Sequence, residues 1–413
     1  MSLLRSRIAA TGDLARQLLG AAAVIGRSFE LETVRAASGR SEDETISGLE
    51  ELGRHGLVRE VGSEADGDIR YDFSHGRLRD EAYDSIGLAR RRLLHRRVAG
   101  ALTTGSREAG DDAARWALIA YHEGLAGRSA EAAEAHRLAG QHARAVFANR
   151  EAREHLEAAL ALGSPQAQEL HESLGDVLTL LGDYAGAIAH LEVAAALAEP
   201  DGRAWVEHRL GLVHARRGEW SRAEGYLDAA LASVSDDDPR FRSALLGDRS
   251  AIAHRAGDGA AAREMAANAL RLAEAADDLA GVARAEDLLG ILARAAGDLP
   301  GAGSHLERSL AAATSSTDPG PRIAALNSLA LVSADTGDRS RAIELTREAL
   351  VLCERQGDRH RQAALENNLA DLLRAVGRPD EAMEHLKRAV AIFADVGGRP
   401  DELEPEIWKL VEW

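Results

Sequence analysis

The chain has 413 residues, of which 45% are hydrophobic and only 4% are aromatic, and it carries a formal charge of -17. The strong helix formers Ala, Leu, Glu and Arg dominate, so the composition predicts a mainly helical protein. Its single cysteine excludes an internal disulfide and a four-cysteine zinc site.

The first predicted elements form a small N-terminal domain over residues 1–86. Three helical stretches come first, and the third opens with Ser41 and Glu44 at the spacing of a capping box. Two strand-like runs, "LVRE" and "IRYDFSH", follow, with a glycine-rich acidic segment between them. Three helices followed by a short β-hairpin predict a winged-helix-like domain.

A winged helix often binds DNA through its third helix, but the charges of this domain disfavour that function. The predicted third helix carries five acidic residues against Arg54, and the hairpin tip is acidic as well. Residues 1–104 contain equal numbers of basic and acidic residues, so the whole negative charge lies in the rest of the chain. The acidic third helix and hairpin tip repel phosphate, and so does the acidic remainder of the chain. We therefore expect nucleic acid to be a disfavoured partner.

A basic cluster lies just beyond this domain, in "ARRRLLHRRVAG". We assign residues 87–128 to connecting helices. The arginines are interpreted as the solvated face of a helix that packs on the first repeats, and a nucleic-acid patch is the alternative interpretation.

A repeat dominates the remainder of the chain. A glycine followed by a charged residue recurs every 36 to 40 residues, and an alanine follows each glycine after five residues. The six glycines are Gly182, Gly218, Gly257, Gly297, Gly337 and Gly377. Each unit reads as two amphipathic helices around a glycine turn, which predicts an all-α superhelix of about seven stacked hairpins over residues 129–398. In the seventh hairpin Phe147 replaces the turn glycine, and residues 399–413 are predicted to form a capping helix.

One stretch formally matches a dinucleotide-binding pattern. Gly257, Gly259 and Ala262 fit G-x-G-x-x-A, a motif that requires a preceding strand. The residues before it have helical periodicity in register with the other repeats, so we interpret the match as a coincidence.

Other catalytic and metal-binding patterns are missing from the sequence. A P-loop needs a lysine that closes a glycine-rich motif, and neither Lys387 nor Lys409 does so. Cys353 lies late in a repeat helix and is interpreted as a structural thiol. Four histidines precede a packing leucine and are interpreted as repeat ancestry: His155, His190, His305 and His385. We expect no catalytic residue, no metal ligand and no enzymatic activity in this chain.

The spacing of Gly175, Gly182, Ala187 and Leu191 resembles the tetratricopeptide repeat. The strings "LLGAAAVIGRSFELETVRAASG" and "ISGLEELGRHGLVRE", followed by these repeats, resemble the C-terminal half of bacterial STAND-type transcriptional regulators. In that family a P-loop ATPase module, a winged helix and a repeat sensor are joined. The resemblance implies ATP or ADP as cofactor of a full-length protein, whereas no cofactor is expected in this chain itself.

The resemblance also implies a role for His75. Phe73, Ser74 and His75 occupy the positions of the family's MHD-like motif, whose histidine senses the nucleotide phosphate, although Gly76 replaces the acidic residue. A histidine that is hydrogen-bonded at the end of a strand is the alternative interpretation.

The first helix of each predicted hairpin lines the concave wall of the superhelix, where such stacks typically accept a peptide or partner segment. Asn327 and Asn367 are the most suggestive candidates, because a side-chain amide can hold an extended backbone in both directions. Eight residues are predicted on or near this wall: His208, Asp287, Arg294, Asn327, Asp335, Asn367, Asp371 and Arg374.

Three functions remain open from the sequence. The leading hypothesis is a non-catalytic sensor and protein-interaction region of a STAND-type regulator. It binds a protein, a peptide or a small-molecule inducer and relays binding through the winged helix to the nucleotide-binding module. The alternatives are a free-standing tetratricopeptide scaffold and a winged-helix DNA-binding regulator, and homo-oligomer formation also stays open. Because the sequence has no run of about 18 apolar residues and no secretory leader, we expect a cytoplasmic protein without a membrane partner.

Overall fold

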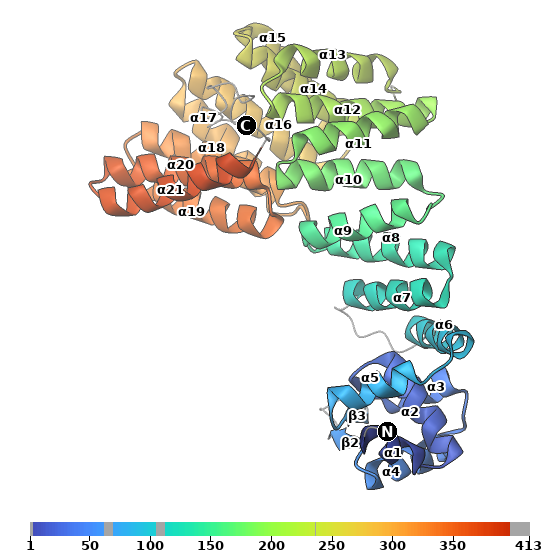
Figure 1. Cartoon of the computed structure of the whole chain (residues 1–413). Coiled ribbons are helices and arrows are strands. Elements are labelled where there is room, and N and C mark those ends of the chain that lie inside the picture. The colour runs from blue at the N-terminus through green and yellow to red at the C-terminus, as the bar shows by residue number, and fades with distance from the viewer. Residues whose placement is uncertain (1–2, 62–68, 105–111, 236, 397–413) are drawn as a thin grey trace. The chain divides into compact units, whose positions relative to one another are not determined.

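The computed structural model describes residues 3–61, 69–104, 112–235 and 237–396. These residues form 21 helices and three short strands, and they divide into two compact units (Figure 1). One unit comprises residues 1–143 and 154–165, and the other comprises residues 144–153 and 166–413. The predicted capping helix over residues 399–413 and the predicted hairpin tip lie outside the described residues.

The N-terminal domain combines five helices with a small antiparallel sheet. In chain order its elements are α1 (Leu3–Ala9), α2 (Asp13–Ile25), β1 (Ser28–Glu30), α3 (Leu31–Ser38), α4 (Glu42–Arg54), β2 (Val58–Val61), β3 (Arg70–Phe73) and α5 (Gly76–Asp84). The strand order is β1-β3-β2, with Phe29 opposite Tyr71 and Arg59 opposite Asp72. The predicted hairpin is therefore confirmed, but strand β1 was missed, because three residues are too short for an alternating pattern.

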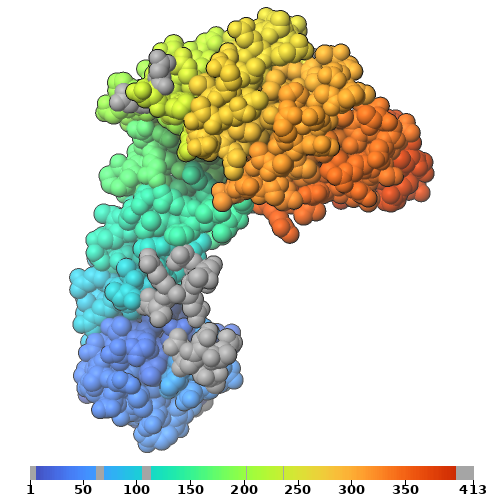
Figure 2. Space-filling view, turned by 180° about the vertical axis from the view of Figure 1, so that it is seen from behind, coloured from blue at the N-terminus to red at the C-terminus, as the bar shows by residue number. Residues whose placement is uncertain are grey.

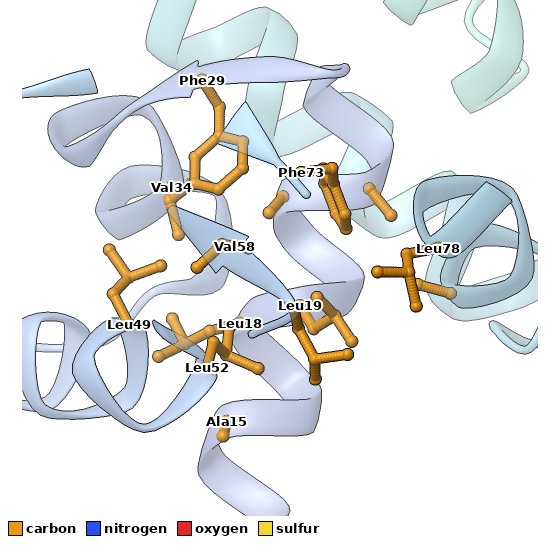
Figure 3. Packing of buried hydrophobic residues seen from close by; sticks show 14 of the residues in the cluster. Ala15, Leu18, Leu19, Phe29, Val34, Leu49, Leu52, Val58, Phe73 and Leu78 are labelled. Carbon is orange, nitrogen blue, oxygen red and sulfur yellow. The ribbon is translucent and has the colours of Figure 1, made fainter. Parts of the chain in front are cut away.

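Large aliphatic and aromatic side chains fill the core of this domain. Figure 3 shows Leu18 and Leu19 of α2 pointing toward Leu49 and Leu52 of α4 and toward the sheet. The rings of Phe29 and Phe73 are in edge-to-face contact, with 5.7 Å between their centroids. Helix α4 begins at the predicted capping box: the amide of Glu44 donates to the Ser41 hydroxyl, and the Ser41 amide donates to the Glu44 carboxylate.

Four helices follow this domain: α6 (Leu88–Thr104), α7 (Asp112–Ala126), α8 (Ser129–Ala145) and α9 (Asn149–Ala161). Arg91 in α6 donates to the backbone oxygens of Tyr83 and Ile86, at 3.0 and 3.2 Å, and Arg97 donates to that of Ser38, at 3.0 Å. These two arginines therefore hold α6 on the N-terminal domain. The basic face was predicted to be solvated, and half-buried Arg91 departs from that prediction, whereas Arg90, Arg92 and Arg96 are exposed.

The second unit is a stack of helical hairpins in chain order (Figure 1). Figure 2 shows the hairpins from α14 to α21, coloured yellow to red, packed side by side. The first helices of the hairpins are α10 (Ala167–Leu181), α12 (Pro200–Arg216), α14 (Pro239–Arg255), α16 (Leu279–Ala295), α18 (Gly320–Asp335) and α20 (Arg359–Ala375). The second helices are α11 (Tyr184–Leu197), α13 (Trp220–Ser233), α15 (Gly259–Ala275), α17 (Leu299–Ala313), α19 (Arg339–Gln356) and α21 (Pro379–Asp395). The predicted helical superhelix is confirmed at this level.

The turn inside each hairpin uses the recurring glycine, and four hairpins also use an aspartate directly after it. All six predicted turn glycines have positive φ, between 76° and 90°, which ends the first helix. Asp183, Asp258, Asp298 and Asp338 then cap the second helix, since each carboxylate accepts from an amide three residues later, whereas Glu219 and Arg378 make no side-chain cap. Phe147 also adopts positive φ, 59°, as expected for the residue that replaces glycine in the degenerate copy.

The dinucleotide-like stretch lies at one of these turns. Helix α14 ends at Arg255 and α15 begins at Gly259, so no strand precedes the glycines. The match to the phosphate-binding pattern is therefore a consequence of the repeat. Among the described helices, none combines the length and apolarity needed to cross a bilayer.

Candidate ligand-binding cavity inside the repeats

The first helices of the hairpins form the inner layer of the second unit. Each of α10, α12, α14 and α16 contacts the first helix of the next hairpin, and α10 also contacts α20. The last hairpin thus returns to the first, and the inner helices enclose a space.

Three polar contacts, which we call the clasp, join the beginning and the end of this unit. Arg216 donates two hydrogen bonds to the Asp358 carboxylate, at 2.9 and 2.7 Å. The Tyr184 hydroxyl lies 2.6 Å from Nδ1 of His360. Asn149 donates through Nδ2 to a backbone oxygen 207 residues later in the sequence, that of Gln356, at 2.9 Å. Contacts at such separations close the stack on itself.

Burial and the Arg216 guanidinium together set the pKa values of Asp358 and His360 in the clasp. Burial alone would raise the pKa of Asp358, whose side chain is 1% exposed, but the Arg216 guanidinium and its hydrogen bonds lower that pKa to about 2. Burial, reinforced by Arg216, lowers the pKa of His360 to about 4. Near pH 7 the clasp therefore contains an ion pair beside a neutral histidine. Cys353 donates to the backbone oxygen of Asp358, and burial raises the pKa of this thiol, which fits the structural role expected for it.

The larger lobe of the enclosed space has a volume of about 570 Å³. It is lined by α12, α13, α14, α16 and α20, and its walls are largely aromatic and aliphatic. Trp205 and Phe241 stack at one side, with 3.7 Å between ring centroids and 9° between ring planes, and Trp220 lies under the guanidinium of Arg255. His208 packs edge-on against Phe241, and its Nε2 atom lies within hydrogen-bonding distance of Oδ2 of Asp248, at 2.6 Å.

A smaller lobe, of about 250 Å³, shares Arg216, Arg284 and Arg361 with the larger one. Asp287 lines this lobe and is 5% exposed, and burial raises its pKa to about 7. Among the described residues, no hydrogen bond of good geometry reaches its Oδ1 atom, although the Ser328 hydroxyl lies near enough to lower the pKa against the effect of burial. An acidic group with an unsatisfied oxygen is costly inside a protein, so its presence in a cavity suggests a binding role.

Models of the tetratricopeptide repeat family match residues 208–240 and residues 322–395. These segments are tetratricopeptide repeats. The fold is typically a non-catalytic scaffold whose groove binds peptides or proteins, and neither match is to a catalytic family. No curated protein matches the chain significantly in sequence.

Several solved structures resemble the chain. A signal transduction ATPase with numerous domains (STAND) protein with a tetratricopeptide repeat sensor, from Pyrococcus horikoshii, gives a TM-score of 0.52 at 13% identity. The alignment covers 97% of this chain and 60% of that protein, so the chain spans less than two thirds of the length of that protein. A tetratricopeptide repeat protein from Parabacteroides merdae gives 0.41 at 14% identity over 73% and 99% of the two chains. A Rap protein complexed with competence and sporulation factor gives 0.45 at 13% identity over 64% and 77%.

The tetratricopeptide fold brings two of the eight predicted groove residues, His208 and Asp287, to the cavity. The other six do not line either lobe, and four of them form ion pairs, either between two helices or within one. Arg294 bonds Asp335 at 2.6 Å, and Asp371 bonds Arg374 at 3.0 Å.

The two predicted asparagines are placed differently from each other. Asn327 is buried and accepts a hydrogen bond from Nδ2 of Asn368, at 3.0 Å, while Asn367 is half-buried. The amide that pairs with Asn327 is therefore the neighbour of the predicted residue, because the inward face of α20 falls on position 368.

Sequence reasoning missed the aromatic wall and the clasp of the tetratricopeptide stack. Trp205 lies 13 residues before the turn glycine of its hairpin and Phe241 lies 16 before its own, so the two rings occupy different positions in the repeat. Repeat register therefore gave no signal for this pair. Arg216 and Asp358 also carried no signal, because nothing in the repeat relates positions 142 residues apart.

The four histidines attributed to repeat ancestry each face the first helix of their own hairpin. His155 and His190 lie within hydrogen-bonding distance of His136 and His171, at 3.0 and 2.8 Å between Nδ1 atoms. The Nδ1 atoms of His305 and His385 lie within hydrogen-bonding distance of the carboxylates of Glu286 and Glu366. In every case the partner precedes the histidine by 19 residues. No group of three or more ligating side chains able to hold a metal occurs among the described residues.

His75 lies at the junction of β3 and α5 in the N-terminal domain. It is exposed, and it forms the N-cap of α5 through its backbone without a capping hydrogen bond from its side chain. Its backbone oxygen accepts from the amide of Leu78. The imidazole is therefore accessible at the surface of this domain.

Proposed function

We propose that this chain is the sensor and protein-interaction region of a STAND-type regulator. In this proposal the repeats bind a ligand or partner, and the N-terminal domain relays binding to a nucleotide-binding module that precedes it in the full-length protein. The observation that carries the proposal is the closed inner layer of the repeats, whose clasp holds a buried ion pair beside a cavity with an unsatisfied carboxylate. Helix packing alone requires none of these groups.

The N-terminal domain is proposed to be a winged helix. The chain order α2-β1-α3-α4-β2-β3, with β3 between β1 and β2 in an antiparallel sheet, supports this proposal. The likeness of fold to the Pyrococcus STAND protein extends over 97% of the chain, which supports the joint assignment of both regions.

DNA binding is the weaker proposal for this domain. Helix α4 begins with three acidic residues, and Arg91 and Arg97 are engaged by backbone oxygens of the same unit. Arg90, Arg92 and Arg96 of α6 remain exposed, so the acidic start of α4 is the observation that disfavours phosphate contacts at that helix. A free-standing scaffold is the second candidate, because the family matches cover repeats alone.

In the proposed relay, His75 contacts the nucleotide phosphate when ATP or ADP is bound by the preceding module. Its exposure next to the sheet supports that role. Ligand binding shifts the equilibrium only if the ligand prefers one of the two arrangements of the regulator.

The test uses a full-length protein that includes the nucleotide-binding module. Release of a fluorescent ADP analogue is measured with and without candidate partners, and in the His75→Ala variant. We expect the partner and the substitution each to accelerate release. His55→Ala, which removes another exposed histidine of the same domain, is the matched control. Unchanged release at saturating partner contradicts the proposed function.

A further inference from the structure

We propose that the cavity binds a small organic anion with an aromatic or aliphatic body. The inference rests on the proposed function, since it names the class of ligand that the sensor region detects. It is carried by the shape of the cavity, its aromatic wall and the distribution of charge between its two lobes.

The size of the cavity fits a small molecule. Its larger lobe, of about 570 Å³, has the volume of a typical small-molecule pocket, and the smaller lobe adds about 250 Å³. The clasp ties the first hairpins to the last beside this space, and Arg216, one of its members, lines both lobes.

The wall of the larger lobe provides a surface for a flat apolar body. The stacked pair of Trp205 and Phe241 presents an aromatic face, with Leu288 and Ile291 of α16 among the other lining residues. Trp205 is 45% exposed although it lies within the second unit, so one face of its ring is left uncovered by the protein. Aromatic stacking on this ring would bury apolar surface on both partners.

The same lobe is positively charged inside an acidic protein. Five arginines line it, against two aspartates: Arg216, Arg240, Arg255, Arg284, Arg361, Asp248 and Asp278. Arg216 is committed to Asp358, but Arg284 is held loosely, with 3.7 Å to Asp278 and a side chain that is 43% exposed. Arg284 can therefore turn toward an anionic group at the junction of the two lobes, both of which it lines.

The smaller lobe provides the second polar contact. Asp287 Oδ1 is buried and unsatisfied there among the described residues. A hydroxyl or amine on the far side of the ligand would satisfy this oxygen. The proposed ligand therefore has an anionic group near Arg284, an apolar body on Trp205 and a hydrogen-bond donor toward Asp287.

The experiment compares two fluorescent probes that share one ring system. Anilinonaphthalene sulfonate carries an anionic group, and phenylnaphthylamine is its uncharged analogue. We expect the anionic probe to bind at one site per chain and more tightly than the neutral probe. Trp205→Ala should weaken both probes by about tenfold or more, because both use the aromatic wall.

Substitution of Arg284 separates the contribution of charge to probe affinity from that of the apolar wall. Arg284→Gln should weaken the sulfonate probe by about tenfold and leave the neutral probe within about twofold. Arg341→Gln is the matched control, because Arg341 makes a similarly loose ion pair, 3.8 Å long, and is 53% exposed on α19. Circular dichroism and thermal melting of each variant exclude loss of the fold as the cause.

Three results would overturn the inference: equal affinity for the two probes, no response of the sulfonate probe to Arg284→Gln, or binding at several sites per chain. A chain ending at Val396 is measured in parallel, and a more than tenfold gain in probe affinity would identify residues 397–413 as the occupant instead. Probe binding as expected without any effect on nucleotide release refutes the proposed function alone. Partner-dependent release without probe binding refutes this inference alone.

Discussion

The N-terminal domain and the repeats bury different kinds of side chain. The core of the former is aliphatic and aromatic, and Thr11 and Thr45 are its buried polar residues among those described up to position 86. The repeats instead bury several ionisable groups, including Glu286, Asp287 and Asp358. Each hairpin of a repeat protein is stabilised by its neighbours, so the inner layer can carry polar groups that a small single core cannot. Burial of these ionisable groups costs the repeats some free energy of unfolding, which the N-terminal domain avoids with its apolar core.

The largest expected effect is on the clasp. Asp358→Ala should lower the free energy of unfolding of the repeats by about 3 to 5 kcal/mol, because it leaves Arg216 without its buried partner and removes a cap of α20. Denaturant unfolding followed by tryptophan fluorescence measures this. Asp371→Ala on the same helix, where the ion pair is exposed, should cost less than about 0.5 kcal/mol. Equal effects of the two substitutions would show that the clasp does not stabilise the closed stack.

The second prediction concerns the apolar core of the N-terminal domain. Leu18→Ala should lower the stability of the N-terminal domain by about 3 kcal/mol, since Leu18 is fully buried between α2 and α4. Hydrogen exchange measured by mass spectrometry reports this loss in β2, β3 and α4. Leu88→Ala, at a leucine that is 66% exposed, should change exchange little. Comparable exchange in both variants would mean that the aliphatic core is not what holds this domain.

A smaller effect concerns the polar interior of the repeats. The pKa of Asp287 is raised by burial from its ordinary 3.8 to about 7, so folding favours the protonated form. The carboxyl group therefore costs no stability below about pH 4, and its penalty grows between about pH 4 and pH 7 and is constant at higher pH. Asp287→Asn should stabilise the protein, by about 2 kcal/mol more at pH 8 than at pH 5. Thermal melts at both pH values measure this, with Asp371→Asn as the exposed control; a gain that is independent of pH contradicts the raised pKa.

The smallest effect tests how closely the helices of one hairpin approach. A Cβ at Gly290 would lie 2.6 Å from Leu306, so Gly290→Ala should destabilise by about 1 kcal/mol. A Cβ at Gly303, in the next helix, meets nothing within 4 Å, and Gly303→Ala should stabilise by about 0.5 kcal/mol. Melting temperatures that move in opposite directions are expected, and a shared direction would refute the close approach.

Much of the local structure could be predicted from the sequence, and the reasons are visible in particular residues. Ser41 and Glu44 specify a helix start within four residues, and the turn glycines specify helix ends through their positive φ. The short strand Ser28–Glu30 was missed, because its partner Arg70–Phe73 lies 40 residues away and its own pattern is too brief. His208 and Asp287 were predicted on or near the concave wall, and they line the cavity. Arg284 and Trp205 also line it but were not predicted, since repeat register gives the inner helix but not the curvature that decides which side chains converge.

The amino-acid sequence by itself determined the hairpins, their turns and the mainly acidic surface, because each depends on residues close together in the chain. The tertiary structure alone decided the clasp and the cavity, in which Asn149 meets Gln356 and Arg216 meets Asp358. Small rotations between successive hairpins add up over the whole stack, and their sum sets whether the last hairpin returns to the first. That sum is a property of packed side chains in every hairpin, so no single stretch of sequence encodes it.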